Sequence, residues 1–147
     1  MEEEDIYEIL KIILGKIGDN EIVWRMEGSA NLMIQGVDIK VNDLDITTKE
    51  DMKNKFRKIF KDFITKDYYN ELFEAQILTL SLKGHEVEIL CRRNNDVLNM
   101  FDEVKNVRWR GLTIPILPLK YASKFYRLIN EPEKVEVIRK HLQPTYQ

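Results

Sequence analysis

Two aspartates separated by a single residue, Asp43 and Asp45, are the side chains of this sequence best suited to chemistry. They lie in the run Ile39–Thr47, whose alternating apolar residues predict a strand, and on a regular strand this spacing places both carboxylates on one face. Like charges held this close repel each other, and a divalent cation between them removes the repulsion. Magnesium prefers a few carboxylates together with water and substrate phosphates. The pair therefore predicts a Mg²⁺ site, with a solvated strand end as the alternative interpretation.

Gly28 and Ser29 form a second candidate group, because they follow the predicted strand Glu21–Met26 and precede a predicted short helix over Ala30–Gln35. Glycine allows a sharp backbone turn and the close approach of a ligand. The free N–H groups at the start of a helix, together with its partial positive charge, favour phosphate binding. The pair therefore predicts a phosphate cradle, and an ordinary turn is the alternative for so short a motif.

A third carboxylate, Glu88, lies in an otherwise apolar run that predicts a strand. Glu86 shares its face, so the sequence leaves open which of the two belongs to a site, and a surface strand with two outward glutamates is the alternative. Combined with the phosphate cradle and the aspartate pair, a third carboxylate completes the set that nucleotidyl transfer requires. Two metal ions can polarise the attacking hydroxyl and neutralise the leaving pyrophosphate. The third carboxylate then completes a metal site or accepts the hydroxyl proton.

The rest of the sequence predicts helices and strands in an order typical of a mixed sheet with helices packed on it. The other predicted helices cover Glu3–Ile17, about Lys49–Ile64, Asn94 or Asn95 to Phe101, Leu119–Ile129 and about Glu133–Leu142. Two predicted hairpins pair Gln76–Leu82 with Glu86–Cys91 and Val104–Trp109 with Leu112–Leu117, whereas Asp67–Ala75 gives no clear signal. We expect an α/β (α+β) fold forming one domain over residues 1–147, with the sheet in about 1–117 and a C-terminal helical pair in about 118–147.

Composition narrows the class of protein. The 23 basic and 25 acidic residues nearly cancel, which argues against a nucleic-acid partner held by bulk positive charge. The single cysteine, Cys91, excludes an internal disulfide framework, and two histidines argue against a histidine-rich metal site. The acidic beginning of the chain is unlike a signal peptide, and no apolar run approaches the length of about 20 residues that a membrane helix needs. We therefore expect a cytoplasmic protein without a membrane partner.

The stretch MEGSANLMIQGVDIKVNDLDI, followed by GHEVEIL, resembles the nucleotidyltransferase superfamily of DNA polymerase β type, and most closely its small prokaryotic nucleotidyltransferase-like members. The C-terminal stretch TIPILPLKYASKFYRLINEPEKVEVIRKHL fits the same proteins, so the resemblance spans about Val23 to Leu142. It implies a nucleotidyltransferase-like fold and an enzyme. The implied reaction is the magnesium-dependent transfer of a nucleoside monophosphate from a nucleoside triphosphate, with ATP expected, to a hydroxyl of a small-molecule or protein acceptor.

The resemblance also implies roles for the motif residues, with Gly28 and Ser29 holding the triphosphate. Asp43, Asp45 and Glu88 would be the catalytic residues and the ligands of a two-metal magnesium site. Relatives commonly place a phosphate-facing lysine in the first C-terminal helix, where the candidates are Lys120, Lys124 and Arg127. None of these three falls clearly on the expected position.

Two basic residues, Arg92 and Arg93, follow the strand of Glu88 and could reach phosphate, although a strand end in solvent is the favoured interpretation. Because fold membership alone does not establish turnover, a catalytically degenerate module that binds a nucleotide or a protein is the alternative function. A metal-dependent phosphoesterase ranks lower, since no histidine lies near the carboxylates. An acceptor pocket would form from Asp67–Ala75 and the C-terminal helices, and a large acceptor would need the open cleft or a second subunit, as in a homodimer.

Overall fold

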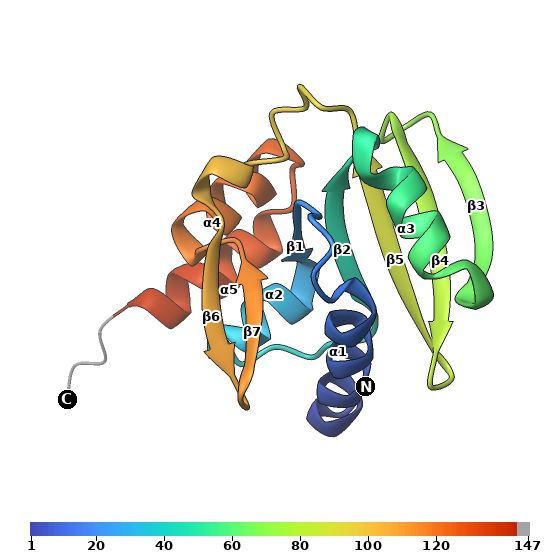
Figure 1. Ribbon diagram of the computed structural model, residues 1–147. Helices are drawn as coiled ribbons and strands as arrows, with labels where there is room; N and C mark the ends of the chain where they lie inside the picture. The colour runs from blue at the N-terminus through green and yellow to red at the C-terminus, as the bar shows by residue number, and fades with distance from the viewer. Residues whose placement is uncertain (144–147) are drawn as a thin grey trace.

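Five strands form the sheet on which the predicted site residues lie, and their order across it is β1-β2-β5-β4-β3. The strands are β1 (Trp24–Glu27), β2 (Leu44–Lys49), β3 (Ile64–Asn70), β4 (Ala75–Leu82) and β5 (His85–Arg92) in this computed structural model, which describes residues 1–143. The central pair β2–β5 is parallel and the other pairs are antiparallel. The predicted mixed sheet is therefore confirmed (Figure 1).

Helices flank this sheet, as the sequence predicts. They are α1 (Glu3–Ile17), α2 (Gly28–Ile34), α3 (Lys53–Ile59), α4 (Leu119–Leu128) and α5 (Pro132–Leu142). A separate hairpin, β6 (Lys105–Trp109) with β7 (Leu112–Ile116), lies beside β1 and precedes the two C-terminal helices. Figure 1 shows α1 and α3 on the near side of the five-stranded sheet and the hairpin with α4 and α5 beyond its β1 edge. None of the helices described in residues 1–143 combines the length and apolar character needed to cross a membrane.

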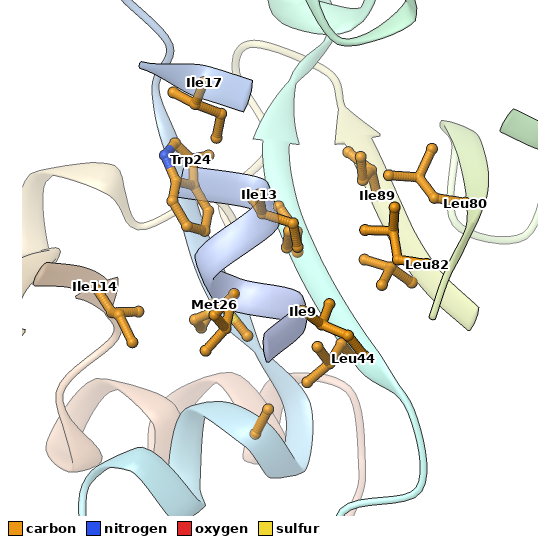
Figure 2. Packing of buried hydrophobic residues seen from close by; sticks show 14 of the residues in the cluster. Ile9, Ile13, Ile17, Trp24, Met26, Leu44, Leu80, Leu82, Ile89 and Ile114 are labelled. Atoms are coloured by element: carbon orange, nitrogen blue, oxygen red, sulfur yellow. The ribbon is translucent and has the colours of Figure 1, made fainter. Parts of the chain in front are cut away.

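The hydrophobic core lies between α1, α3 and one face of the sheet. Because strand residues alternate between faces, Leu44 and Ile46 of β2 point the same way and are fully buried. Ile9 and Ile13 of α1, four residues apart on the apolar stripe of that helix, pack against this face, as Figure 2 shows. Each such side chain stabilises the fold by about 1.5–3 kcal/mol on burial. The opposite face of β2 is thereby left to the polar residues.

Strand β2 begins at Leu44, later than the predicted strand Ile39–Thr47, so Asp43 lies in a bend just before it. The predicted helix over Lys49–Ile64 is too long, because Lys49 still pairs with β5 and Ile64 already pairs with β4. The segment Asp67–Ala75, which gave no clear signal, contains most of β3 and the turn into β4.

The predicted helix from Asn94 or Asn95 to Phe101 is wrong, since the chain forms turns there and a 3₁₀ turn only at Phe101–Glu103. The physical reason is a contact distant in sequence. The guanidinium of Arg25 donates from Nη2 to the carbonyl of Leu98 at 2.9 Å and from Nε to that of Asn99 at 3.0 Å. A residue of β1 thereby holds this segment against the sheet in a non-helical path.

Candidate active-site cleft

Three carboxylates lie side by side on neighbouring strands, on the face of the sheet opposite the core. In the antiparallel register of β1 and β2, Glu27 is the partner of Asp45, and in the parallel register of β2 and β5 Asp45 is the partner of Glu88. The structure thus brings Asp45 and Glu88 together, whereas Glu86 pairs with Ser81 near the end of β4 and is exposed. Glu27 is an addition that sequence reasoning missed.

Gly28 packs directly against the carboxylate of Asp45. It has φ +70°, and a Cβ atom added to it would lie 2.8 Å from Asp45 Oδ2. Only glycine fits this position without displacing the aspartate, because an L-residue would meet both the contact and an unfavourable backbone conformation. Helix α2 begins at Gly28 itself, two residues earlier than predicted, and Ser29 occupies its first turn.

Helix α2 is fixed to the start of the C-terminal region by one buried side chain. Asn31 donates from Nδ2 to the carbonyl of Leu117 at 2.9 Å, and its Oδ1 accepts from the N–H of Leu117 at 2.9 Å. Gln35, one turn along, donates to the same carbonyl at 2.8 Å. The strand–Gly-Ser–helix arrangement is thus held from both sides, by the sheet and by the segment that leads into α4.

Negative charge accumulates around Asp45. Burial raises the pKa of its carboxyl group to about 7, and repulsion from Glu27, Glu88 and Asp43 adds to the effect. The pKa of Glu88 is also raised, mainly by burial and then by Glu86 and Asp43. Lys134 is the cation that acts against the shift at Asp45. Such an accumulation favours either a bound proton or a bound cation.

The side chains around Asp45 offer the donor type that a hard divalent cation prefers. Every candidate ligand is a carboxylate oxygen, a donor type that suits Mg²⁺ better than zinc, which prefers sites with His or Cys. Within residues 1–143, however, no group of three or more His, Cys, Asp or Glu side chains is gathered closely enough to hold a metal ion. Asp43 is exposed and precedes β2, so only Asp45 of the predicted pair faces the cleft described below. The residues therefore fit a magnesium ion in donor type, without forming a closed ligand cage.

Glu27 differs from the other two carboxylates because its charge is compensated. Its Oε1 accepts a hydrogen bond from Thr47 Oγ1 at 2.6 Å and another from Arg92 Nη2 at 3.1 Å, and Arg25 Nη2 lies 3.7 Å away. The favoured interpretation of Arg92 as a solvent-exposed strand end is therefore wrong, since its exposed fraction is 4%. Arg93, the next residue, is exposed.

A cleft of about 700 Å³ opens over these carboxylates. Its volume falls within the range of about 300–1,000 Å³ that is typical of small-molecule sites. Its polar lining comprises Glu27, Asp45, Glu88, Arg92, Arg93 and Lys134, together with Glu74, Asp96 and Glu131. Four exposed apolar residues from three separate segments gather at the same cleft, namely Leu72, Phe73, Val97 and Leu128. A carboxylate floor and an apolar rim thus belong to one cavity.

The two lysines predicted to face phosphate do not line this cleft. Lys120 Nζ lies 5.5 Å from the ring of Tyr121, and Lys124 lines a separate hollow of about 190 Å³. The reason is the orientation of α4, which buries Phe125 and Tyr126 and leaves Lys120 and Lys124 exposed. The lysine that lines the cleft is Lys134, in the first turn of α5. No sequence signal distinguished it from the other lysines.

No protein-family model matches this sequence, and no curated protein sequence does. Among the solved structures that resemble it over nearly the whole chain are the following three. The Thermotoga maritima protein TM1012, described as a candidate nucleotidyltransferase, is 26% identical with a TM-score of 0.78, and the match covers 97% of this chain and 95% of that one. The lincosamide antibiotic adenylyltransferase LnuA, with lincomycin bound, is 11% identical with a TM-score of 0.63 over 95% of this chain and 97% of that one.

The third structure is ANT(2'')-Ia in complex with adenylyl-2''-tobramycin, which is 9% identical with a TM-score of 0.60 over 92% of this chain and 88% of that one. At this level of identity, the two antibiotic-modifying enzymes show a common fold. Together with the order of strands and the position of Gly28 against Asp45, these likenesses show that the chain has the nucleotidyltransferase-like superfamily fold that its motifs predict.

Proposed function

We propose that this protein transfers a nucleoside monophosphate from a nucleoside triphosphate to a hydroxyl group of a small-molecule acceptor. The observation that carries the proposal is the pair Asp45 and Glu88 on adjacent parallel strands, with Gly28 packed against Asp45 at the floor of a cleft. A carboxylate pair beside a strand–glycine–helix turn places metal ligands next to a surface that a triphosphate can approach.

Asp45 and Glu88, with Asp43 at the strand entrance, would hold magnesium. The ion would supply charge neutralisation for the phosphates and polarisation of the acceptor hydroxyl. In the reaction the hydroxyl oxygen bonds to the α-phosphorus, the bond from that phosphorus to the bridging oxygen breaks, and pyrophosphate leaves. The hydroxyl proton passes to a carboxylate of the cleft, for which Glu88, on the strand next to Asp45, is the candidate. Gly28 leaves room for the Asp45 carboxylate, and Lys134 supplies a positive group at the cleft, whereas Ser29, in the first turn of α2, does not line it.

A small-molecule acceptor is favoured over a protein by the shape of the cleft. The volume is that of a small-molecule site, and the apolar rim formed by Leu72, Phe73, Val97 and Leu128 suits an acceptor with one apolar face. LnuA with lincomycin bound and ANT(2'')-Ia with adenylyl-2''-tobramycin are adenylyltransferases of this fold that use small-molecule acceptors, which supports ATP as the nucleotide here.

Nucleotide binding and transfer can be tested separately. Isothermal titration with each of the four triphosphates at millimolar Mg²⁺ should reveal binding to the wild-type protein, with ATP expected to bind most tightly. Asp45→Asn should abolish the magnesium-dependent part of that binding. Asp38→Asn, the same substitution at an exposed residue outside the cleft, should leave it unchanged. Absence of binding by all four triphosphates would overturn the proposal.

Transfer is tested with ATP labelled in the α-phosphate and a panel of hydroxylated small molecules with an apolar face. Label should move to an acceptor and pyrophosphate should be released, and Asp45→Asn should stop both. One observation favours a second candidate, a nucleotide-binding module without turnover, because no three acidic side chains are gathered into a metal cage in the described part of the chain. Binding of Mg²⁺ and ATP without pyrophosphate release from any acceptor mixture would support that module.

A further inference from the structure

Two arginines lie beneath the cleft on the face of one phenylalanine ring. The guanidinium carbon of Arg25 lies 5.4 Å from the centre of the Phe125 ring, and that of Arg92 lies 5.6 Å from it. Both side chains are almost fully buried, and both form an ion pair with Glu27. A guanidinium stays charged when buried and keeps five N–H donors that require acceptors. The two residues differ in how far that requirement is met.

Arg25 is satisfied by the backbone. Its Nε, Nη1 and Nη2 donate to the carbonyls of Asn99, Met26 and Leu98 at 3.0, 3.0 and 2.9 Å. These bonds attach the segment after β5 to the sheet, which is a structural role. Only Arg92 of the two lines the cleft.

Arg92 retains a donor without a partner. Its Nη2 donates to Glu27, but its Nε is buried and has no acceptor, and among the described residues the other buried side-chain atom in this state is Asn99 Oδ1. An unpaired buried donor on a charged group costs about 1–3 kcal/mol or more. The other cations of the cleft are engaged at the rim, Arg93 with Glu74 and Lys134 with Glu131. The spare hydrogen-bonding capacity of the cleft floor is therefore concentrated on Arg92.

We propose that Arg92 binds the phosphate chain of the nucleotide through its free Nε–H, while Glu27 orients the guanidinium; this assignment rests on the proposed function. Arg92 lies four residues after Glu88 on β5, and the two therefore share one face of the strand. A guanidinium matches phosphate because its planar donors pair with two oxygens at once. Since Nε is covered, binding includes a small rotation of the guanidinium over the Phe125 ring.

The probe is tripolyphosphate with Mg²⁺, which has the phosphate chain without a nucleoside. Isothermal titration should give binding to the wild-type protein and about ten- to hundredfold weaker binding to Arg92→Met, the range expected for loss of a charge-assisted hydrogen bond. Arg92→Lys, which keeps the charge and loses the planar donors, should fall between the two. Arg57→Met is the control, because Arg57 pairs with Asp67 outside the cleft.

A measurement on the wild-type protein keeps the test valid if Arg92→Met does not fold. In a ¹⁵N spectrum of arginine side chains, the Nε–H resonance missing from Arg92→Lys is assigned to Arg92, and it should shift when tripolyphosphate is added. Equal affinity of wild type and Arg92→Met, or an unmoved Arg92 resonance at saturation, would overturn this inference and leave the proposed function standing. A wild-type protein that binds no triphosphate would overturn the proposed function itself.

Discussion

The two faces of strand β2 contribute to the stability of the fold with opposite sign. On one face Leu44 and Ile46 are fully buried beneath α1 and stabilise the fold. On the other face lies Asp45, the residue between them, whose pKa is raised to about 7 by burial and then by the neighbouring carboxylates. Alternate residues of one six-residue strand thus supply stability and electrostatic strain. The comparison teaches that the sheet tolerates a costly polar face because its core face is densely packed.

The largest effect is expected on the core face. Ile46→Ala removes a fully buried side chain from the centre of the sheet, so it should lower the free energy of unfolding by about 2–5 kcal/mol through lost burial and the resulting cavity. Urea denaturation followed by circular dichroism measures the change. A loss below 1 kcal/mol, within the range of surface substitutions, would contradict the assignment of this face as the main source of stability.

The opposite face should respond with the opposite sign. The pKa of Asp45 rises from 3.8 to about 7 on folding, so the folded protein holds a proton that the unfolded chain releases between these values. The wild-type free energy of unfolding is therefore reduced progressively as pH rises through this window, by at most about 4 kcal/mol above pH 7. Asp45→Asn removes the charge, so without metal it should stabilise the protein at pH 8 and change little at pH 4.

The measurement is the difference in free energy of unfolding between Asp45→Asn and wild type, as a function of pH, in a chelator. Asp43→Asn provides the control, because it removes the same charge from an exposed residue two positions away and should change stability much less. A difference at Asp45 that stays constant from pH 4 to pH 8 would contradict the burial and repulsion described for its carboxyl group.

A smaller effect is expected at the glycine beside the polar face. Gly28→Ala and Gly84→Ala both place a side chain at positive φ, +70° and +77°, which costs about 1–2 kcal/mol each. A Cβ at Gly84 would have open space, whereas at Gly28 it would meet Asp45 Oδ2. Thermal denaturation should therefore show a loss for both that is larger for Gly28→Ala, and only Gly28→Ala should weaken binding of Mg²⁺ and ATP. Equal nucleotide binding by the two variants would show that Gly28 does not contribute to the nucleotide site.

Local patterns in the sequence predicted most of the fold. Local signals identified α1, the hairpin strands β4 and β5 and the two C-terminal helices, whereas β3 was missed. The turn at Gly28 and the proximity of Asp45 and Glu88 could also be predicted, because a glycine after a strand and carboxylates in apolar strands are local signals. The choice between Glu86 and Glu88 required the register.

What the sequence could not predict depends on contacts between distant segments. Glu27 enters the carboxylate row only because β1 pairs with β2 in one particular register. Lys134 replaces Lys120 and Lys124 at the cleft because packing of Phe125 determines which side of α4 faces the sheet. In each case the deciding interaction spans a sequence separation that periodicity does not register.

The attachment of the 93–100 segment by Arg25 has a consequence for how this protein could diversify. Arg25 fastens the segment through backbone carbonyls, which every residue type possesses, and within the segment the side chains of Asp96 and Asn99 hydrogen-bond its backbone, whereas Val97 takes no part in these bonds. Val97, at the rim of the cleft, is therefore free to vary in size and polarity without loosening the cleft wall. Under the proposed function, a substitution at Val97 would change the acceptor preference while the carboxylate floor stays constant.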